Sequence, residues 1–205
     1  MEWRATIALS FSAGALAATL LLSRRKRHFS WRKQQFLLPD GTSCWLRNAS
    51  SADIVKVYQQ ICDLAAHEND ELQTTQCDVA KAFARRDFYV LLAEIDSVVV
   101  ASAIFQDSYR TWTGPSLYLQ DIIVDAPLRG KGLGTLLMQG LASVAIQRGC
   151  NQMFWESHEF NAKANAFYAE TVGGENIRGD HQLLTWKLVG EDRLVACAAR
   201  AQPVS

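Results

Sequence analysis

The feature that most restricts the fold of this 205-residue chain is a strand, a glycine-rich turn and a helix in direct succession. Residues 117–124 are rich in β-branched and aromatic side chains, and residues 127–134 contain three glycines. From Leu133 onward, apolar residues recur at the spacing of one helix face. The turn suits an anion, because glycines expose backbone N–H groups, a helix N-terminus is electropositive, and Arg129 and Lys131 add charge.

The other periodicities predict an α/β fold, in which a mixed, mostly antiparallel sheet is flanked by helices. Two β-rich runs, 89–94 and 98–105, are separated by a short turn typical of a hairpin, and the strand at 116–124 continues the meander. Further strands are expected at 43–47, 152–156 and 182–188, and helices from 54 to near 69, at 78–86, from 133 to 149 and at 161–171.

Composition limits the chain to one ordinary globular domain, with 49% apolar and 20% charged residues. The formal net charge of zero disfavours nucleic acid as a partner. It hides a division, since the first 33 residues carry seven basic and one acidic side chain, and the rest carry 14 basic and 20 acidic. Five cysteines without a C-x-x-C pair predict neither a disulfide framework nor a metal site, and fit a reducing compartment.

The N-terminus is expected to anchor the chain in a membrane. Residues 5–22 carry no charge, and a helix of this length spans about 27 Å, close to a bilayer core of about 30 Å. The basic run 24–27 follows this segment directly, which predicts a single-pass anchor with the C-terminal domain in the cytosol. A mitochondrial location is the alternative. The expected division is an anchor at 1–28, a tether at 29–42, a domain at 43–189 and a tail at 190–205.

The glycine turn differs from the common nucleotide-binding motifs. It lacks the G-K-[ST] of a Walker loop, and it follows a late strand rather than the first strand of a parallel unit. Arg129, Gly132 and Gly134 instead meet the [RQ]-x-x-G-x-[GA] motif, which resembles the GNAT superfamily of N-acetyltransferases. Trp112-Thr113-Gly114, Leu117-Tyr118-Leu119, Asp121, Arg148-Gly149-Cys150, Asn161 and Phe167-Tyr168 are similar to the diamine and thialysine acetyltransferase branch, over roughly residues 44–188.

The resemblance implies acetyl-CoA as co-substrate, no metal, and a small cationic amine as acceptor, with a homodimer as a further expectation. It implies that Tyr168 protonates the leaving thiolate and that Gln120 occupies the catalytic position beside the acyl group. Glu68 and Trp112, together with Gln120, are implied to line the amine site. Cofactor contacts are implied at Ile122, Ile123, Val124, Arg129, Gly130, Lys131, Gly132, Leu133, Gly134, Thr135 and Asn161.

Gln120 departs from the resemblance, because diamine acetyltransferases have a glutamate at this position. An alkylamine with a pKa of about 10.4 is neutral in only about one molecule in 2,500 at pH 7, and an amide side chain cannot take its proton. Glu68 or Glu156 acting through water, a slow reaction, or a substrate of lower pKa all remain open. Strand alternation places Gln120 on the face of Ile122 and Val124.

The predicted function is acetyl-CoA-dependent N-acetylation of a polyamine-like or amino-acid amine, by direct attack on the thioester. An acidic domain suits a cationic substrate, because it raises the local cation concentration. Two alternatives stay open at this point: a membrane-tethered acyl-CoA-binding pseudoenzyme, suggested by Gln120, and a protein N-acetyltransferase.

Overall fold

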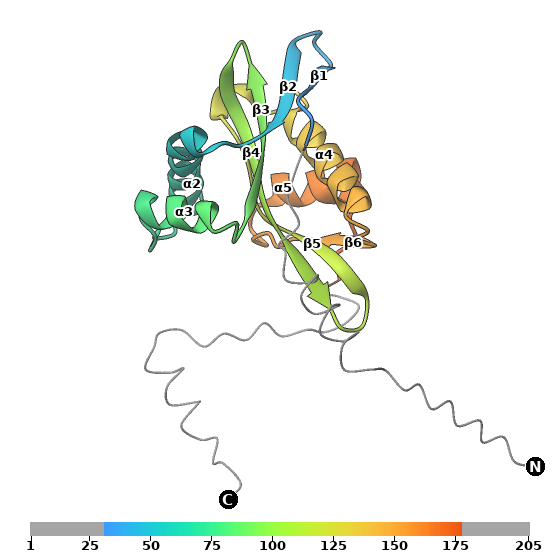
Figure 1. Cartoon of the computed structure of the whole chain (residues 1–205). Coiled ribbons are helices and arrows are strands. Elements are labelled where there is room, and N and C mark those ends of the chain that lie inside the picture. Colours follow the sequence, from blue (N-terminus) through green and yellow to red (C-terminus); the bar gives the residue numbers. More distant parts are fainter. Residues whose placement is uncertain (1–30, 178–205) are drawn as a thin grey trace, which may run out of the picture. The chain divides into compact units, whose positions relative to one another are not determined.

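The computed structural model describes residues 31–177, which divide after His158 into two compact units. The first unit contains a six-stranded sheet in the order β1-β2-β3-β4-β5-β6, in which every neighbouring pair is antiparallel except β5 and β6 (Figure 1). The predicted mixed, mostly antiparallel sheet is therefore confirmed. Its strands are β1 (Gln34–Leu37), β2 (Ser43–Asn48), β3 (Tyr89–Ile95), β4 (Val98–Arg110), β5 (Gly114–Val124) and β6 (Gln152–Phe154).

Helices cover both faces of the sheet (Figure 1). The short helix η1 (Ser51–Asp53) leads into α2 (Ile54–Glu68), and α2 and α3 (Gln76–Ala84) lie on one side. Val57 of α2 packs in a buried cluster with Val90 and Ile104 of β3 and β4. On the other side α4 (Leu133–Gln147) approaches the sheet at Gly140, where an added Cβ would lie 2.7 Å from Leu91. Gly140 therefore permits the close packing of α4 on β3.

One strand was missed by the sequence analysis. β1 pairs with β2 from Gln34 opposite Leu46 to Leu37 opposite Ser43, within residues expected to form a tether. Its side chains are mostly exposed, so the segment carries little of the hydrophobic pattern that identifies a strand.

An ion-pair network ties the first strands to η1. Arg47 Nε contacts Glu94 Oε2 at 2.6 Å, and Lys33 Nζ contacts Glu94 Oε1 at 2.9 Å. The Arg47 guanidinium also contacts Asp53 through two oxygens, at 2.8 and 2.9 Å. The hydrogen bonds from Arg47 lower the pKa of Asp53 to about 2. Arg47 thus holds β2, β3 and η1 together at one end of the sheet.

The second unit differs from the single helix predicted over 161–171. α5 (Ala162–Ala166) continues into η3 (Phe167–Val172), a segment with the wider π-helical hydrogen bonding, and the chain turns at Gly173 with φ +75°. The predicted strand 182–188, the tail and the anchor at 1–28 lie outside the described residues. Within residues 31–177, no helix combines the length and apolar character needed to cross a bilayer.

Candidate active site

β5 has strand partners on both edges over only part of its length. β4 pairs with it from Gly114 to Val124, whereas β6 pairs only with Ser116, Leu117 and Tyr118. Among the described residues, no strand covers the second edge beyond Tyr118. The segment Ile122–Val124 therefore presents backbone groups along an edge to which an extended ligand can add as a further strand.

The loop after β5 has the geometry of an anion cradle. It runs through η2 (Ala126–Leu128) to Gly130 and Gly132, whose φ angles of +80° and +90° favour glycine, and α4 begins at the next residue. The first N–H groups of α4, at Leu133, Gly134 and Thr135, have no acceptor in a preceding helical turn. These donors and the positive end of a helix dipole fit a pyrophosphate group.

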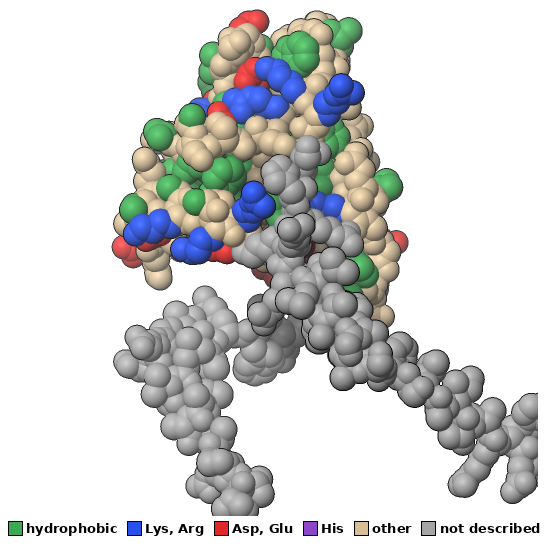
Figure 2. Space-filling view, viewed as in Figure 1, with side chains coloured by type: hydrophobic (Ala, Val, Ile, Leu, Met, Phe, Trp, Pro, Cys, Tyr) green, Lys and Arg blue, Asp and Glu red, His purple; other side chains and the backbone are tan. Residues whose placement is uncertain are grey.

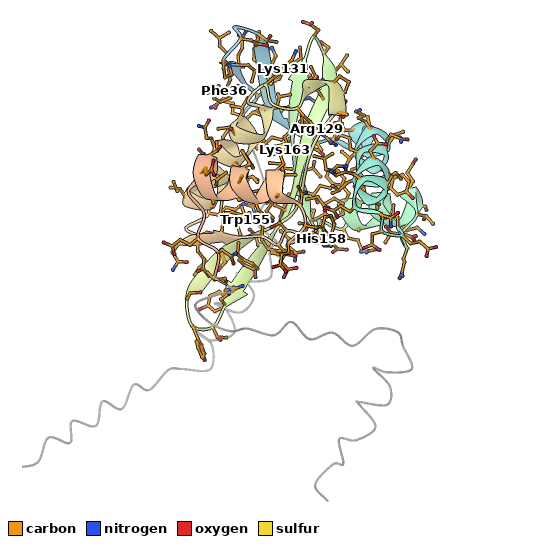
Figure 3. The ribbon with its side chains drawn as sticks, turned by 180° about the vertical axis from the view of Figure 1, so that it is seen from behind. Phe36, Arg129, Lys131, Trp155, His158 and Lys163 are labelled. Carbon is orange, nitrogen blue, oxygen red and sulfur yellow. The ribbon has the colours of Figure 1, made fainter. Side chains whose placement is uncertain are left out.

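Two basic side chains flank this loop. Arg129 and Lys131 are both exposed, and they lie where β5 ends and α4 begins (Figure 3). Arg129 Nε donates to the Val124 carbonyl at 3.1 Å, which anchors its side chain beside the open edge of β5. Figure 2 shows Lys and Arg side chains near this end of the sheet and a second group over α3. The predicted cofactor-binding residues from Ile122 to Thr135 are thus contiguous around one strand end.

Asp125, which sequence reasoning missed, fixes the start of this loop. Its carboxylate accepts from Lys56 Nζ and from Gln60 Nε2, each at 2.8 Å, and both donors belong to α2. Its N–H donates to the Val100 carbonyl of β4 at 2.9 Å. Gln60 is fully buried, so its bond to Asp125 forms away from water. The loop is therefore positioned from both β4 and α2, through contacts between residues far apart in the sequence.

A β-bulge lies at Gln120. Leu119 is opposite Phe105 and Asp121 is opposite Ile104, so Gln120 is one extra residue in β5 without a cross-strand partner. Opposite residues of an antiparallel pair share a face, and neighbours along β4 alternate. The Asp121 side chain therefore lies on the same sheet face as Ile104, which α2 covers. The Leu119 side chain lies on the opposite face, with Phe105. The strict alternation expected through Gln120 does not hold, and its side chain is exposed.

Asp121 is a partly buried carboxylic acid among other titratable groups. Burial, and then the negative charge of Glu68 at the end of α2, raise the pKa of Asp121 to about 6. His158 Nε2 lies 3.4 Å from Glu68 Oε2, and Figure 3 shows His158 beside α2. Burial, Glu156 and Asp121 raise the pKa of Tyr118. A carboxylate with a pKa of about 6 is mostly ionised at pH 7 and accepts a proton more readily than an ordinary aspartate.

The remaining predicted residues belong to other segments of the chain. Trp112 is 98% exposed at the tip of the β4–β5 hairpin, and Asp121 is about 20 Å further along β5 at the usual rise per residue. The structure thus does not bring Trp112 and Glu68 together within this chain. Asn161 and Tyr168 belong to the second unit. Asn161 Oδ1 accepts from the Ala164 N–H at 3.2 Å and caps α5, and the Tyr168 ring lies 5.3 Å from that of Phe167.

The sheet, the open edge of β5 and the glycine loop define an acetyltransferase fold. Comparison of the sequence with known protein families gives the same result. The model of the acetyltransferase (GNAT) family matches residues 54–173, and the chain belongs to this family. Mouse (Mus musculus) thialysine N-epsilon-acetyltransferase is 29% identical over 161 residues, which are 71% of this chain and 92% of the relative. Human (Homo sapiens) spermidine/spermine N(1)-acetyltransferase-like protein 1 is 32% identical over 119 residues, 53% of this chain and 17% of that protein.

A solved structure shares the fold. The predicted acetyltransferase from Clostridium acetobutylicum, solved with acetyl-CoA, superposes with a TM-score of 0.58 at 16% identity, over 70% of this chain and 96% of that one. GNAT enzymes use acetyl-CoA as the acetyl donor. In the described part of the chain, no three His, Cys, Asp or Glu side chains are grouped to hold a metal.

Proposed function

We propose that this protein transfers the acetyl group of acetyl-CoA to the primary amine of a small cationic substrate, of the polyamine or amino-acid type. The observation that carries the proposal is the open edge of Ile122–Val124 leading directly into the Gly130–Gly132 cradle. An extended pantetheine arm adds to the edge, while the loop amides, Arg129 and Lys131 bind the pyrophosphate.

The acidic surroundings of Asp121 support a cationic acceptor. Glu68 and Glu156 both act electrostatically on this part of the site, Glu68 on Asp121 and Glu156 on Tyr118. A group of carboxylates attracts an ammonium and orients it by charge-assisted hydrogen bonds. The names of the relatives point in the same direction, since thialysine, spermidine and spermine all carry alkylamines.

The reaction is an acyl transfer by direct attack. The substrate ammonium loses a proton, its nitrogen attacks the thioester carbonyl carbon, and the C–S bond breaks as the amide forms. Tyr168 is proposed to give the leaving thiolate its proton, and Asn161 to contact the CoA arm. The exposed Gln120 amide holds the amine or a water molecule beside the acyl group.

Release of free CoA with spermidine, thialysine and lysine tests this proposal. We expect turnover with at least one of the three. In Arg129→Ala the Kd for acetyl-CoA should rise by about ten- to a hundredfold, because a charged hydrogen bond contributes about 1.5–3 kcal/mol. Arg85→Ala, which removes an exposed arginine paired with Asp87 on the opposite side of the sheet from α4, is the matched control and should bind acetyl-CoA normally. Tight acetyl-CoA binding without turnover of any amine would refute the proposed activity.

The location of the protein is proposed from the sequence alone. The uncharged segment 5–22 and the basic run that follows it support a single membrane anchor with the catalytic domain on the cytosolic side. Carbonate extraction of the expressed full chain tests this: the protein should stay in the membrane pellet, and its release into the supernatant would contradict the anchor.

A further inference from the structure

We propose that Asp121 is the group that accepts the proton of the substrate ammonium, and that Glu68 is a positioning residue that sets the basicity of Asp121. This inference rests on the proposed function and assigns a step that Gln120 cannot perform. An alkylammonium with a pKa of about 10.4 must lose a proton before its nitrogen can attack. A carboxamide has no basic site for that proton, whereas the next residue along the strand is a carboxylate.

The bulge decides which side of the sheet receives this carboxylate. In an unbroken strand Asp121 would share the face of Leu117 and Leu119, which are 0% and 1% exposed. The extra residue at Gln120 instead places it opposite Ile104, on the face covered by α2. The C-terminal end of α2 brings Glu68 close enough to act on Asp121 electrostatically.

The groups around Asp121 come from three elements. Glu68 belongs to α2, Tyr118 to the same strand as Asp121, and Glu156 and His158 to the segment after β6. His158 contacts Glu68, with 3.4 Å between His158 Nε2 and Glu68 Oε2. Burial and the charge of Glu68 both favour the protonated form of Asp121, so its pKa rises to about 6 and its conjugate base is stronger.

The proton and electron balance of the step is simple. One ammonium N–H bond breaks, its proton bonds to an Asp121 oxygen, and the electron pair stays on the substrate nitrogen. This pair forms the new C–N bond to the thioester carbonyl, and the C–S bond breaks with its electrons on sulfur. The thiolate takes the proton of Tyr168, and the second proton lost by the nitrogen restores the Tyr168 hydroxyl. Asp121 releases the first proton to solvent before the next turnover.

The pH dependence of kcat/KM tests the assignment. If Asp121 is the acceptor, kcat/KM rises with pH through an inflection near pH 6 and then levels off well below the amine pKa. In Asp121→Asn this inflection should disappear, and activity at pH 7 should fall by about 10²- to 10⁴-fold. The deficit should shrink toward pH 10, where much of the amine is already neutral, whereas loss of substrate binding or of folding would persist there.

Glu68→Gln tests whether the charge of Glu68 sets the basicity of Asp121. It removes the neighbouring charge, so the inflection should move to lower pH while the rate at the plateau is largely kept. Glu71→Gln makes the same change at an exposed acid just beyond α2 and should leave the profile unmoved. The affinity for acetyl-CoA, measured on each variant, confirms that the protein is folded.

The outcomes distinguish the two levels of proposal. No turnover by the wild-type protein with any amine refutes the proposed function, and this inference with it. Turnover that Asp121→Asn retains at pH 7, or a wild-type profile that climbs steadily toward the amine pKa without an inflection near 6, overturns the role of Asp121 alone. An inflection that moves equally in Glu68→Gln and Glu71→Gln overturns the role of Glu68.

Discussion

Replacement of Gly132 by alanine should destabilise the loop through two separable effects. The first is conformational, because Gly132 has φ +90° and a left-handed backbone costs a residue with a Cβ about 1–2 kcal/mol. The second is steric, because the new Cβ would lie 2.9 Å from Cδ and 3.2 Å from Cγ of Pro39, and both atoms belong to a ring that cannot rotate away. The loop and the β1–β2 turn would have to separate by a few tenths of an ångström.

Gly130 provides the matched control for this substitution. Its φ of +80° imposes a similar conformational cost, but an added Cβ meets nothing within 4 Å. In urea unfolding, Gly130→Ala should lower the free energy of unfolding by about 1–2 kcal/mol, and Gly132→Ala should exceed this by about 1–3 kcal/mol, the usual range for overpacking.

A double-mutant cycle isolates the steric part. In Pro39→Ala the ring atoms near Gly132 are gone, so the cost of Gly132→Ala in that background should fall to the cost of Gly130→Ala. Equal costs for Gly132→Ala with and without the proline ring, or a Gly132→Ala no more destabilised than Gly130→Ala, would show that the close approach to Pro39 is not what this glycine serves.

Three further predictions concern acidic residues. Because Arg47 lowers the pKa of Asp53 to about 2 from 3.8, this pair stabilises the fold above pH 4, and about 2 kcal/mol should be lost as the pH falls toward 2 in urea titrations, but not in Asp53→Asn. Asp125→Ala leaves the buried Gln60 amide without its partner, so the free energy of unfolding should drop by about 1–3 kcal/mol and the calorimetric Kd for acetyl-CoA should rise. The raised pKa of Asp121 means that the folded state binds its proton more tightly, so the free energy of unfolding of the wild type falls between about pH 4 and 6. Asp121→Asn lacks this loss. The stability of the variant minus that of the wild type should therefore increase by up to about 3 kcal/mol from pH 4 to pH 8.

The strand–loop–helix unit was predictable because its information is local. Period-2 alternation, two glycines with positive φ and a helical apolar face each occupy fewer than about 18 consecutive residues, the window in which periodicity is informative. β1 was missed for the opposite reason, since Gln34 and Gln35 are exposed and the strand is defined only by its pairing with β2. Asp125 was missed because its partners Lys56 and Gln60 are separated from it by 69 and 65 residues.

The bulge at Gln120 could not be predicted from β5 alone. A bulge is a difference in residue count between two paired strands, so it requires the register with β4, which places Phe105 and Ile104 opposite Leu119 and Asp121. Without that register, strict alternation places Gln120 on the face of Ile122 and Val124, and an extra residue at this point breaks that alternation. The pairing with β4, which the sequence of β5 does not contain, is what places Asp121 opposite Ile104.

The same bulge connects the two halves of the proposed site. An extra residue bends its strand and increases the local twist, and the pairing of β5 with β6 ends at Tyr118, two residues before Gln120. Beyond the bulge, no strand within residues 31–177 pairs with the outer edge of β5, and Asp121 lies on the sheet face that α2 covers. In the proposed site, the cofactor arm and the proton acceptor would both depend on the course that β5 takes after Leu119. Gln120 is the extra residue of this bulge, and its exposed amide cannot itself act as the base.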